Sequence, residues 1–215
     1  MKIRPLLALL LVFGLVAVTT YTYKNTNLPT SNNLAAVSGA GSGLVLNYTF
    51  DEGSGATSAD LSGNSNSATL INNPGWTSGK SGGAISVTGT TYARSSNPVS
   101  LSGSFTASAW INISDYPAAG ASANILENAY NTGFKLGIYN NGVNTSVQFQ
   151  GGGNPTFTYD GLPKGQWVHI AAAVDNSSVK LYLNGSEIAG GYAPIGNQNL
   201  PIFIGTYFHQ PGDSS

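Results

Sequence analysis

The sequence contains no cysteine, so neither disulfide bonds nor thiol chemistry can contribute to its fold or its function. Charged residues are also scarce, at 8% of the 215 residues, whereas an average soluble domain has roughly a quarter. The formal net charge of −1 provides no basic surface to neutralise phosphates, which argues against a nucleic-acid partner. Long surface helices usually depend on Glu, Lys and Arg, so their scarcity favours short strands joined by Gly, Asn and Ser turns.

The clearest pattern in the chain is a period-two alternation in residues 166–175. Val168, Ile170, Ala172 and Val174 fall on one side of an extended chain, and more polar or aromatic residues fall on the other. Residues 179–183 repeat the alternation, and Asn184-Gly185 follows with the residue types that a tight hairpin turn requires. The pattern predicts two antiparallel strands that share one apolar face.

The rest of the chain after residue 43 predicts further short strands separated by turns. Asn140-Asn-Gly142 gives a second hairpin signal between two of them. Many short strands with no convincing helix predict an all-β fold, an antiparallel β-sandwich. The strands are expected at residues 44–50, 68–71, 84–87, 91–94, 105–113, 124–127, 134–139, 145–150, 187–190 and 202–205.

The N-terminus has a different composition. Lys2 and Arg4 precede a continuous apolar run over residues 6–18, which is typical of an export signal. No clear cleavage site follows directly, so residues 1–23 are interpreted as a signal peptide or an uncleaved helical membrane anchor, with a buried core helix as a weaker alternative. Residues 24–43 are predicted to be a flexible linker, and residues 44–215 to be the folded domain.

Six motifs in order resemble one family, the LamG-like jelly roll of the concanavalin A-like lectin/glucanase superfamily. The resemblance covers residues 44–205 and implies a jelly-roll sandwich, without specifying a ligand. The motifs are Tyr48-Thr-Phe-Asp-Glu-Gly-x-Gly55, Asp60-x-Ser-Gly-Asn64, Phe105-Thr-x-Ser-x-Trp110, Gln166-Trp-x-His169, Leu181-Tyr-Leu-Asn-Gly185 and Ile204-Gly205.

The chain departs from the family pattern after Gly205. Members of the family usually end with one more strand, reading roughly Ile-Asp-Glu-Val-x-Ile-Tyr, and nothing after Gly205 matches it. We therefore expect a C-terminally truncated domain from a longer protein that contained further domains. The absent strand would leave a neighbour unpaired, most plainly residues 44–50, and an open edge invites association with another chain.

The resemblance also implies a structural Ca²⁺ held by rim loops. The matching positions are Asp51, Asp60 and Asn64, whose side chains supply the oxygen ligands that Ca²⁺ prefers. The alternative is that Asp51 and Asp60 cap turns through local hydrogen bonds. Without the final strand, which would add an acidic ligand, any calcium site should be weakened.

Several aromatic and amide residues occupy strand positions outside the predicted core. Sugars bind flat aromatic rings flanked by amide and hydroxyl groups, because a pyranose has an apolar face and a polar rim. Trp110 and Trp167 lie in fold-defining motifs and are interpreted either as sugar-contacting residues or as packing residues. Solvent exposure is expected for Tyr139, Gln148 and Tyr182. The candidate carbohydrate-binding residues are Tyr139, Gln148, Tyr182, Trp110 and Trp167.

The sequence offers little for catalysis. The glucanases of the superfamily use carboxylates at alternating positions of one strand, because two carboxyl groups must face the same sugar about 5 to 9 Å apart. Asp51 and Glu52 are adjacent and so point to opposite faces, while Glu127 and Glu187 are isolated. We therefore expect a non-catalytic protein.

Together these patterns predict a secreted or cell-surface recognition module that binds carbohydrate by stacking and hydrogen bonding. Its partner would be a glycan or a cell-surface molecule, with the N-terminal segment as a membrane tether. The alternative is a structural or adhesive domain that contacts protein or cell-surface partners through its loops and binds no sugar.

Overall fold

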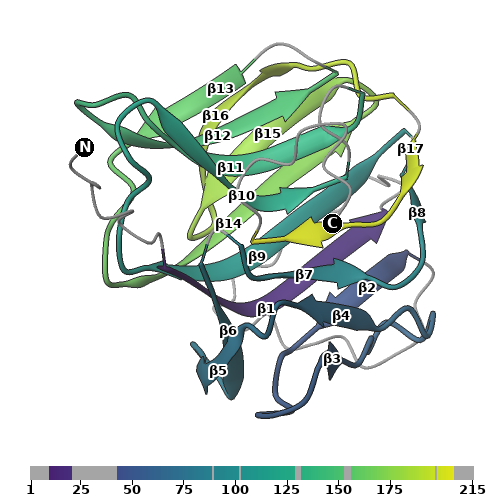
Figure 1. The fold of residues 1–215 in the computed structure, drawn as a ribbon. Helices are drawn as coiled ribbons and strands as arrows, with labels where there is room; N and C mark the ends of the chain where they lie inside the picture. Colours follow the sequence, from purple (N-terminus) through teal and green to yellow (C-terminus); the bar gives the residue numbers. More distant parts are fainter. Residues whose placement is uncertain are drawn as a thin grey trace, which may run out of the picture.

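The computed structural model describes residues 10–20, 43–88, 90–101, 103–128, 132–152, 156–196 and 198–205. Within these ranges every regular element is a β-strand, which confirms the all-β prediction. The strands form two large antiparallel sheets that overlap in Figure 1, as expected for a jelly-roll sandwich.

The first sheet has the strand order β16-β15-β14-β9-β1-β6-β5, with β2 also paired to β1. Its strands are β1 (Leu10–Thr20), β2 (Leu44–Tyr48), β5 (Gly75–Ser78), β6 (Gly83–Thr88), β9 (Phe105–Ile113), β14 (Trp167–Asp175), β15 (Ser178–Leu183) and β16 (Ser186–Tyr192).

The second sheet has the strand order β13-β12-β11-β10-β18-β7-β4-β3. Its strands are β3 (Thr57–Ser58), β4 (Ala68–Ile71), β7 (Tyr92–Ser95), β10 (Ala121–Glu127), β11 (Phe134–Asn140), β12 (Thr145–Gly151), β13 (Thr156–Asp160) and β18 (Phe203–Ile204). A separate two-stranded ribbon pairs β8 (Val99–Leu101) with β17 (Gln198–Leu200).

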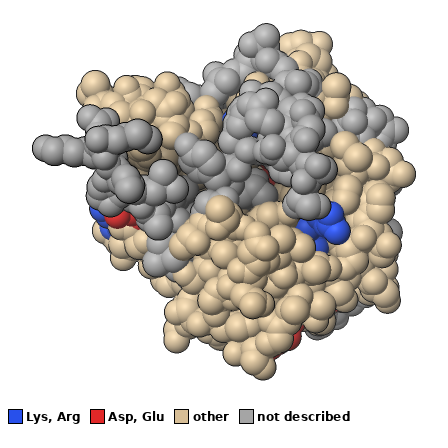
Figure 2. All heavy atoms as spheres, viewed as in Figure 1, with Lys and Arg blue, Asp and Glu red and all other residues tan. Residues whose placement is uncertain are grey.

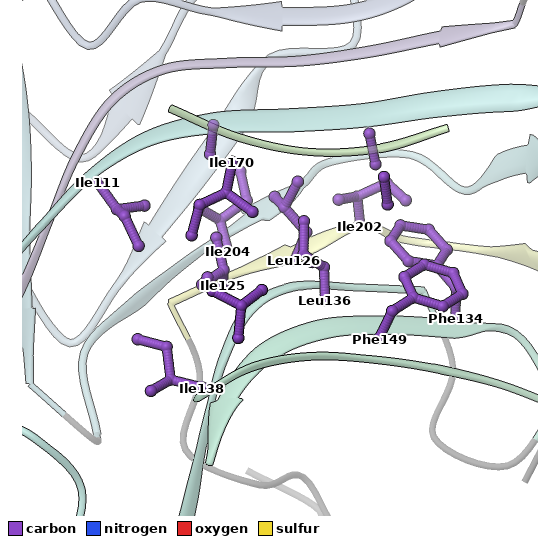
Figure 3. Packing of buried hydrophobic residues seen from close by; sticks show 14 of the residues in the cluster. Ile111, Ile125, Leu126, Phe134, Leu136, Ile138, Phe149, Ile170, Ile202 and Ile204 are labelled. Carbon is purple, nitrogen blue, oxygen red and sulfur yellow. The ribbon is translucent and has the colours of Figure 1, made fainter. Parts of the chain in front are cut away.

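The core lies between the two sheets, where alternate side chains from each sheet meet. In β9 buried and half-buried residues alternate along the whole strand, and in β14 the predicted core residues Val168, Ile170, Ala172 and Val174 are all buried. Figure 3 shows Ile111 and Ile170 of the first sheet facing Ile125, Leu126 and Leu136 of the second. The apolar face predicted from the period-two pattern is therefore confirmed.

Both predicted hairpin turns are present. Asn184 and Gly185 adopt φ angles of 50° and 82° between β15 and β16, the left-handed pair expected for this turn. Gly142 adopts a φ of 91° in the turn between β11 and β12. These turns fix the pairing of the strands that carry most of the candidate site residues.

The N-terminal segment contributes one described strand, and its interpretation as a signal or anchor helix stays a prediction. Its backbone over residues 10–20 forms β1, which runs between β9 on one side and β6 and β2 on the other (Figure 1). The segment is rich in Val and Thr and contains Gly14, so its local preferences favour a strand over a helix. No helix among the described residues has both the length and the apolar character to cross a membrane.

The edge expected to stay open at residues 44–50 is covered. β2 pairs with β1 through four residues, from Leu44 opposite Thr19 to Tyr48 opposite Val16. Residues 1–9, most of the predicted linker 24–43 and residues 206–215 lie outside the described part of the chain. Signal cleavage, membrane anchoring, the domain limits and the absence of a last strand therefore stay predictions.

Candidate functional site

The outer face of the second sheet carries a row of polar and aromatic side chains that crosses neighbouring strands. Core residues such as Leu136, Ala93 and Ile204 point inward, so their neighbours along each strand point outward. Cross-strand partners share a face, and the strand registers place six residues in one line. The row reads Gln150 (β12), Lys135 (β11), Glu127 (β10), Phe203 (β18), Arg94 (β7) and Thr69 (β4).

Glu127 is the most perturbed acid on this face. Its side chain is 3% exposed and accepts a hydrogen bond from the Nδ2 atom of Asn124. Burial raises the pKa of Glu127 to about 7, and the neighbouring Lys135 and the Asn124 hydrogen bond only partly offset this rise. Lys135 is 5% exposed, and burial lowers its pKa. A buried acid and a buried base thus lie side by side, and Glu127 is partly protonated near neutral pH.

A second set of polar residues continues the face toward the β11–β12 hairpin. Gln148 lies opposite Gly137, and its Nε2 atom donates a hydrogen bond of 3.1 Å to Ser122 Oγ. Tyr139 lies opposite both Ser122 and Ser146. The structure therefore brings the predicted site residues Tyr139 and Gln148 to one face, although Gln148 is 6% exposed instead of solvent-exposed as predicted.

Gly137 lies at a close approach of two strands on this face. A Cβ atom at this position would lie 2.8 Å from the carbonyl oxygen of Ala123, which is closer than a side chain tolerates. The glycine therefore lets β11 pack tightly against β10 between Asn124 and Gln148.

An aromatic pair lies at the other end of the row. Tyr92 and Phe203 are half-buried, and their ring centroids are 6.0 Å apart with an interplanar angle of 41°. Both residues point outward, because their neighbours Ala93 and Ile204 belong to the core. The pair supplies the apolar ring surface that sugar recognition requires.

Arg94 projects from the same strand as Tyr92. Its cross-strand neighbours are the uncharged Phe203 and Thr69, and neither ion pair in the described part of the chain includes it. Its Nε atom is buried and has no hydrogen-bond partner among the described residues. Buried donors are almost always satisfied in folded proteins, so this atom is an exception among the described residues.

The other three predicted sugar-binding residues lie on the opposite sheet. Trp110, Trp167 and Tyr182 are half-buried on the outer face of the first sheet, on β9, β14 and β15. Trp110 packs against His169 with ring centroids 5.3 Å apart and an interplanar angle of 53°, and the Nζ atom of Lys80 lies 5.5 Å from the Trp110 ring centroid. Tyr139 and Gln148 therefore do not form one platform with these residues, because the core separates the two outer faces.

The predicted calcium ligands are hydrogen-bonded to groups of the chain itself, both near to them and far from them in the sequence. Asp60 accepts hydrogen bonds from the backbone N–H groups of Asn47, Ser62 and Asn66 and from the Ser62 hydroxyl, at 2.8–3.1 Å. Asp51 accepts a bond of 2.6 Å from the Gly83 N–H. As arranged, both Asp60 oxygens are fully engaged by donors, so the residues present do not fit a ready calcium cage.

Asn64 borders a surface pocket of about 400 Å³ beside the start of β2. Its Nδ2 atom donates to the carbonyl oxygens of Leu44 and Val45, at 2.9 and 3.0 Å. No group of three or more His, Cys, Asp or Glu side chains suited to a metal exists among the described residues.

Sequence patterns alone missed Glu127, Lys135, Arg94, Tyr92 and Phe203 as parts of one face. Alternation within β11 places Lys135 with Tyr139, which was a usable signal. The pairing of β10 with β18 and of β18 with β7, however, joins residues far apart in the chain, and no local pattern encodes it.

Comparisons with known proteins agree with this architecture. Domain 4 of AbnA, a GH43 extracellular arabinanase from Geobacillus stearothermophilus solved in complex with arabinotriose, is 22% identical with a TM-score of 0.52 and covers 71% of this chain and 80% of that one. The carbohydrate-binding module CBM66 from Bacillus subtilis is 16% identical with a TM-score of 0.38, covering 65% of this chain and 88% of that one. Curated proteins give no match.

The family comparison is the decisive one. A family profile described as the concanavalin A-like lectin/glucanases superfamily matches residues 87–214. The matched region includes the strands β7 to β18, which are four of the eight strands of the first sheet and six of the eight strands of the second. The chain belongs to the concanavalin A-like lectin/glucanase superfamily, in its laminin G-like branch.

Proposed function

We propose that the protein is a non-catalytic carbohydrate-recognition module that binds a glycan on the outer face of the second sheet. The observation that carries the proposal is the row of hydrogen-bonding side chains between Gln150 and Arg94, with the Tyr92–Phe203 ring pair at its end. Most of the molecular surface carries uncharged side chains, as Figure 2 shows for one side. A surface of this composition suits a polar polymer such as a glycan.

The chemistry of the face matches a sugar in two respects. Hydroxyl and amide groups on the half-buried Ser122, Tyr139 and Gln150 can donate and accept the hydrogen bonds that a pyranose rim requires. The rings of Tyr92 and Phe203 offer an apolar surface for the axial C–H groups. Several such contacts across five strands favour a chain of sugars over a single residue.

The spacing of the acids supports binding without hydrolysis. The other described carboxylate on this face is Asp160, which lies opposite Ser146 on β13. Three strand spacings separate β13 from Glu127 on β10, or roughly 14 Å at about 4.8 Å each. Glycosidases place their two carboxyl groups about 5 to 9.5 Å apart.

The module acts outside the cell, on a glycan of a cell surface or of the surroundings. The basic residues Lys2 and Arg4 followed by an apolar run support export. Calcium at Asp51, Asp60 and Asn64 remains a separate proposal from the family resemblance, and it requires metal to replace the donors that Asp60 now accepts.

The proposal is tested by screening the full chain against a glycan array and by measuring the affinity of each positive ligand. Tyr139→Ala with Gln148→Ala should weaken binding about tenfold or more, because both residues lie on the proposed face. Tyr182→Ala is the matched control, since this tyrosine lies on the opposite sheet and should bind normally.

Uniform silence of the array would overturn the proposal and favour a structural or adhesive domain. Equal losses from the double variant and from Tyr182→Ala would also contradict it, because only one sheet face is proposed to bind. Unchanged melting temperatures would show that the variants remain folded.

A further inference from the structure

We propose that this face selects acidic polysaccharides, with the carboxylate of a uronic acid held by Arg94. The inference rests on the proposed function, because it names the class of sugar that the same face takes. It is argued from the distribution of charge along the Gln150–Thr69 row.

The row contains two bases and one acid. Lys135 lies directly opposite Glu127, so these two buried groups compensate each other. Arg94 is separated from Glu127 by the intervening strand β18, where Phe203 lies between them. The charges of Lys135 and Glu127 cancel, so the row has one positive charge in excess, that of Arg94.

Arg94 is placed to receive an anion. Its side chain is half-buried, its Nε atom has no partner in the described chain, and its cross-strand neighbours carry no charge. A guanidinium presents its donors as a planar fork that matches a carboxylate with two parallel hydrogen bonds. A carboxylate can pair with the two terminal Nη atoms of that fork, which does not require access to the buried Nε.

The aromatic pair next to Arg94 fixes which anion fits best. Tyr92 precedes Arg94 by two residues on β7 and therefore lies on the same face, and Phe203 lies opposite Arg94 on β18. A uronic acid carries its carboxylate on a ring carbon, beside the apolar C–H face of the sugar. One sugar residue can therefore stack on the rings of Tyr92 and Phe203 while its carboxylate reaches Arg94. A bare inorganic anion would use the charge but not the rings.

Glu127 does not oppose this ligand at neutral pH. Burial keeps part of the Glu127 population protonated, and Lys135 offsets the remaining negative charge. The acid on the face is thus compatible with an acidic polymer.

The test compares two forms of one polymer, polygalacturonate and its fully methyl-esterified counterpart, by calorimetry with the full chain. The two share ring geometry and differ in charge, so the expected result is at least tenfold tighter binding of the acid form. Arg94→Gln should abolish that preference while leaving the ester affinity within about twofold, and Arg94→Lys should keep part of it. Lys180→Gln on the opposite sheet is the matched control and should bind like the unaltered chain.

Equal binding of both polymers, or an equal loss of both in Arg94→Gln, would overturn the selection for acid while leaving carbohydrate binding in place. Preference for a neutral polymer such as arabinan would do the same. Absence of binding to every polymer tested would overturn this inference together with the proposed function. Tighter binding of a sulfated glycan than of the uronate would show that the site takes a different anion.

Discussion

The N-terminal strand β1 should be required for the folded domain, because it joins the two halves of the first sheet. In the strand order, β1 is the element between β9 and β6, and it is also the strand to which β2 is paired. Removing residues 1–42 would therefore separate β16-β15-β14-β9 from β6-β5 and from β2. We predict that residues 43–215 alone lose the cooperative unfolding transition or associate through the exposed edges.

The size of the effect follows from the pairing of β9 with β1. Eight residues of β9 pair with β1. In an antiparallel sheet, the backbone N–H and C=O groups of every second residue point toward the same neighbouring strand. About four residues of β9 would therefore each lose one donor and one acceptor partner. At about 1 kcal/mol for each group left unsatisfied, the loss is roughly 8 kcal/mol. This approaches the whole free energy of unfolding of a typical domain, about 5 to 15 kcal/mol.

A milder change tests the same strand within the full chain. Val16 pairs with both Tyr48 and Ala109, so Val16→Pro removes a ladder donor from the middle of a sheet. The expected loss is about 1 to 3 kcal/mol, or a fall in melting temperature of roughly 2 to 12 °C. Asn32→Pro in the predicted linker is the control and should melt like the unaltered chain.

The assay is thermal unfolding followed by circular dichroism, with size-exclusion chromatography to detect association. Adding a peptide with the sequence of residues 10–20 should restore a cooperative transition to residues 43–215, and a scrambled peptide should not. The reasoning is refuted if residues 43–215 are monomeric and melt at the temperature of the full chain. That outcome would leave the N-terminal segment to export or anchoring alone.

Three further predictions concern single groups. The pKa of Glu127 is raised by burial, so the folded state binds its proton more tightly than the unfolded state, and the free energy of unfolding should fall as pH rises from about 4.5 to 7. Glu127→Gln should flatten this dependence of the unfolding free energy on pH, measured by urea titration at each pH. An unchanged slope would contradict the raised pKa of Glu127. Asp60→Asn should lower stability by about 2 to 4 kcal/mol, because a charged acceptor of several hydrogen bonds is lost, whereas Asp175→Asn at an exposed strand end should change it little. Calcium should raise the melting temperature only at millimolar concentrations, since it must displace the donors of Asp60; a shift at micromolar calcium would show a stronger site than these residues present.

The strands of the sandwich were predictable where one face is buried and the other is not. In β9 and β14 alternation alone identified the core residues, because burial of every second side chain is what such a strand requires. The bounds of β4 and β9 match the prediction, and the two Asn-Gly turns fixed their hairpins. The short strands β3, β5, β8, β13 and β17 were missed, since they are polar or too brief to show a period.

The N-terminal segment was ambiguous for a physical reason. A continuous apolar run has no period, so it fits a signal, an anchor or a central strand that is apolar on both faces. Its position next to basic residues favoured export, whereas the open pairing positions of β9, β6 and β2 favour a strand. Only the second argument depends on the rest of the chain, which is why local reasoning did not reach it.

The candidate site shows the same limit more sharply. Tyr139 and Gln148 could be named from the sequence because β11 and β12 form a local hairpin, and the structure places them on one face. Trp110, Trp167 and Tyr182 satisfied the same pattern but lie on the other sheet, because period two reports which side of a strand a residue occupies and not which sheet the strand joins. The Glu127–Phe203–Arg94 line depends on β18 lying between β10 and β7, which is a property of the topology. The unpaired positive charge of Arg94 in this row follows from the topology, because β18 separates Arg94 from Glu127. A strand order that placed β7 directly beside β10 would pair the two charges and remove the basis for selecting an acidic sugar.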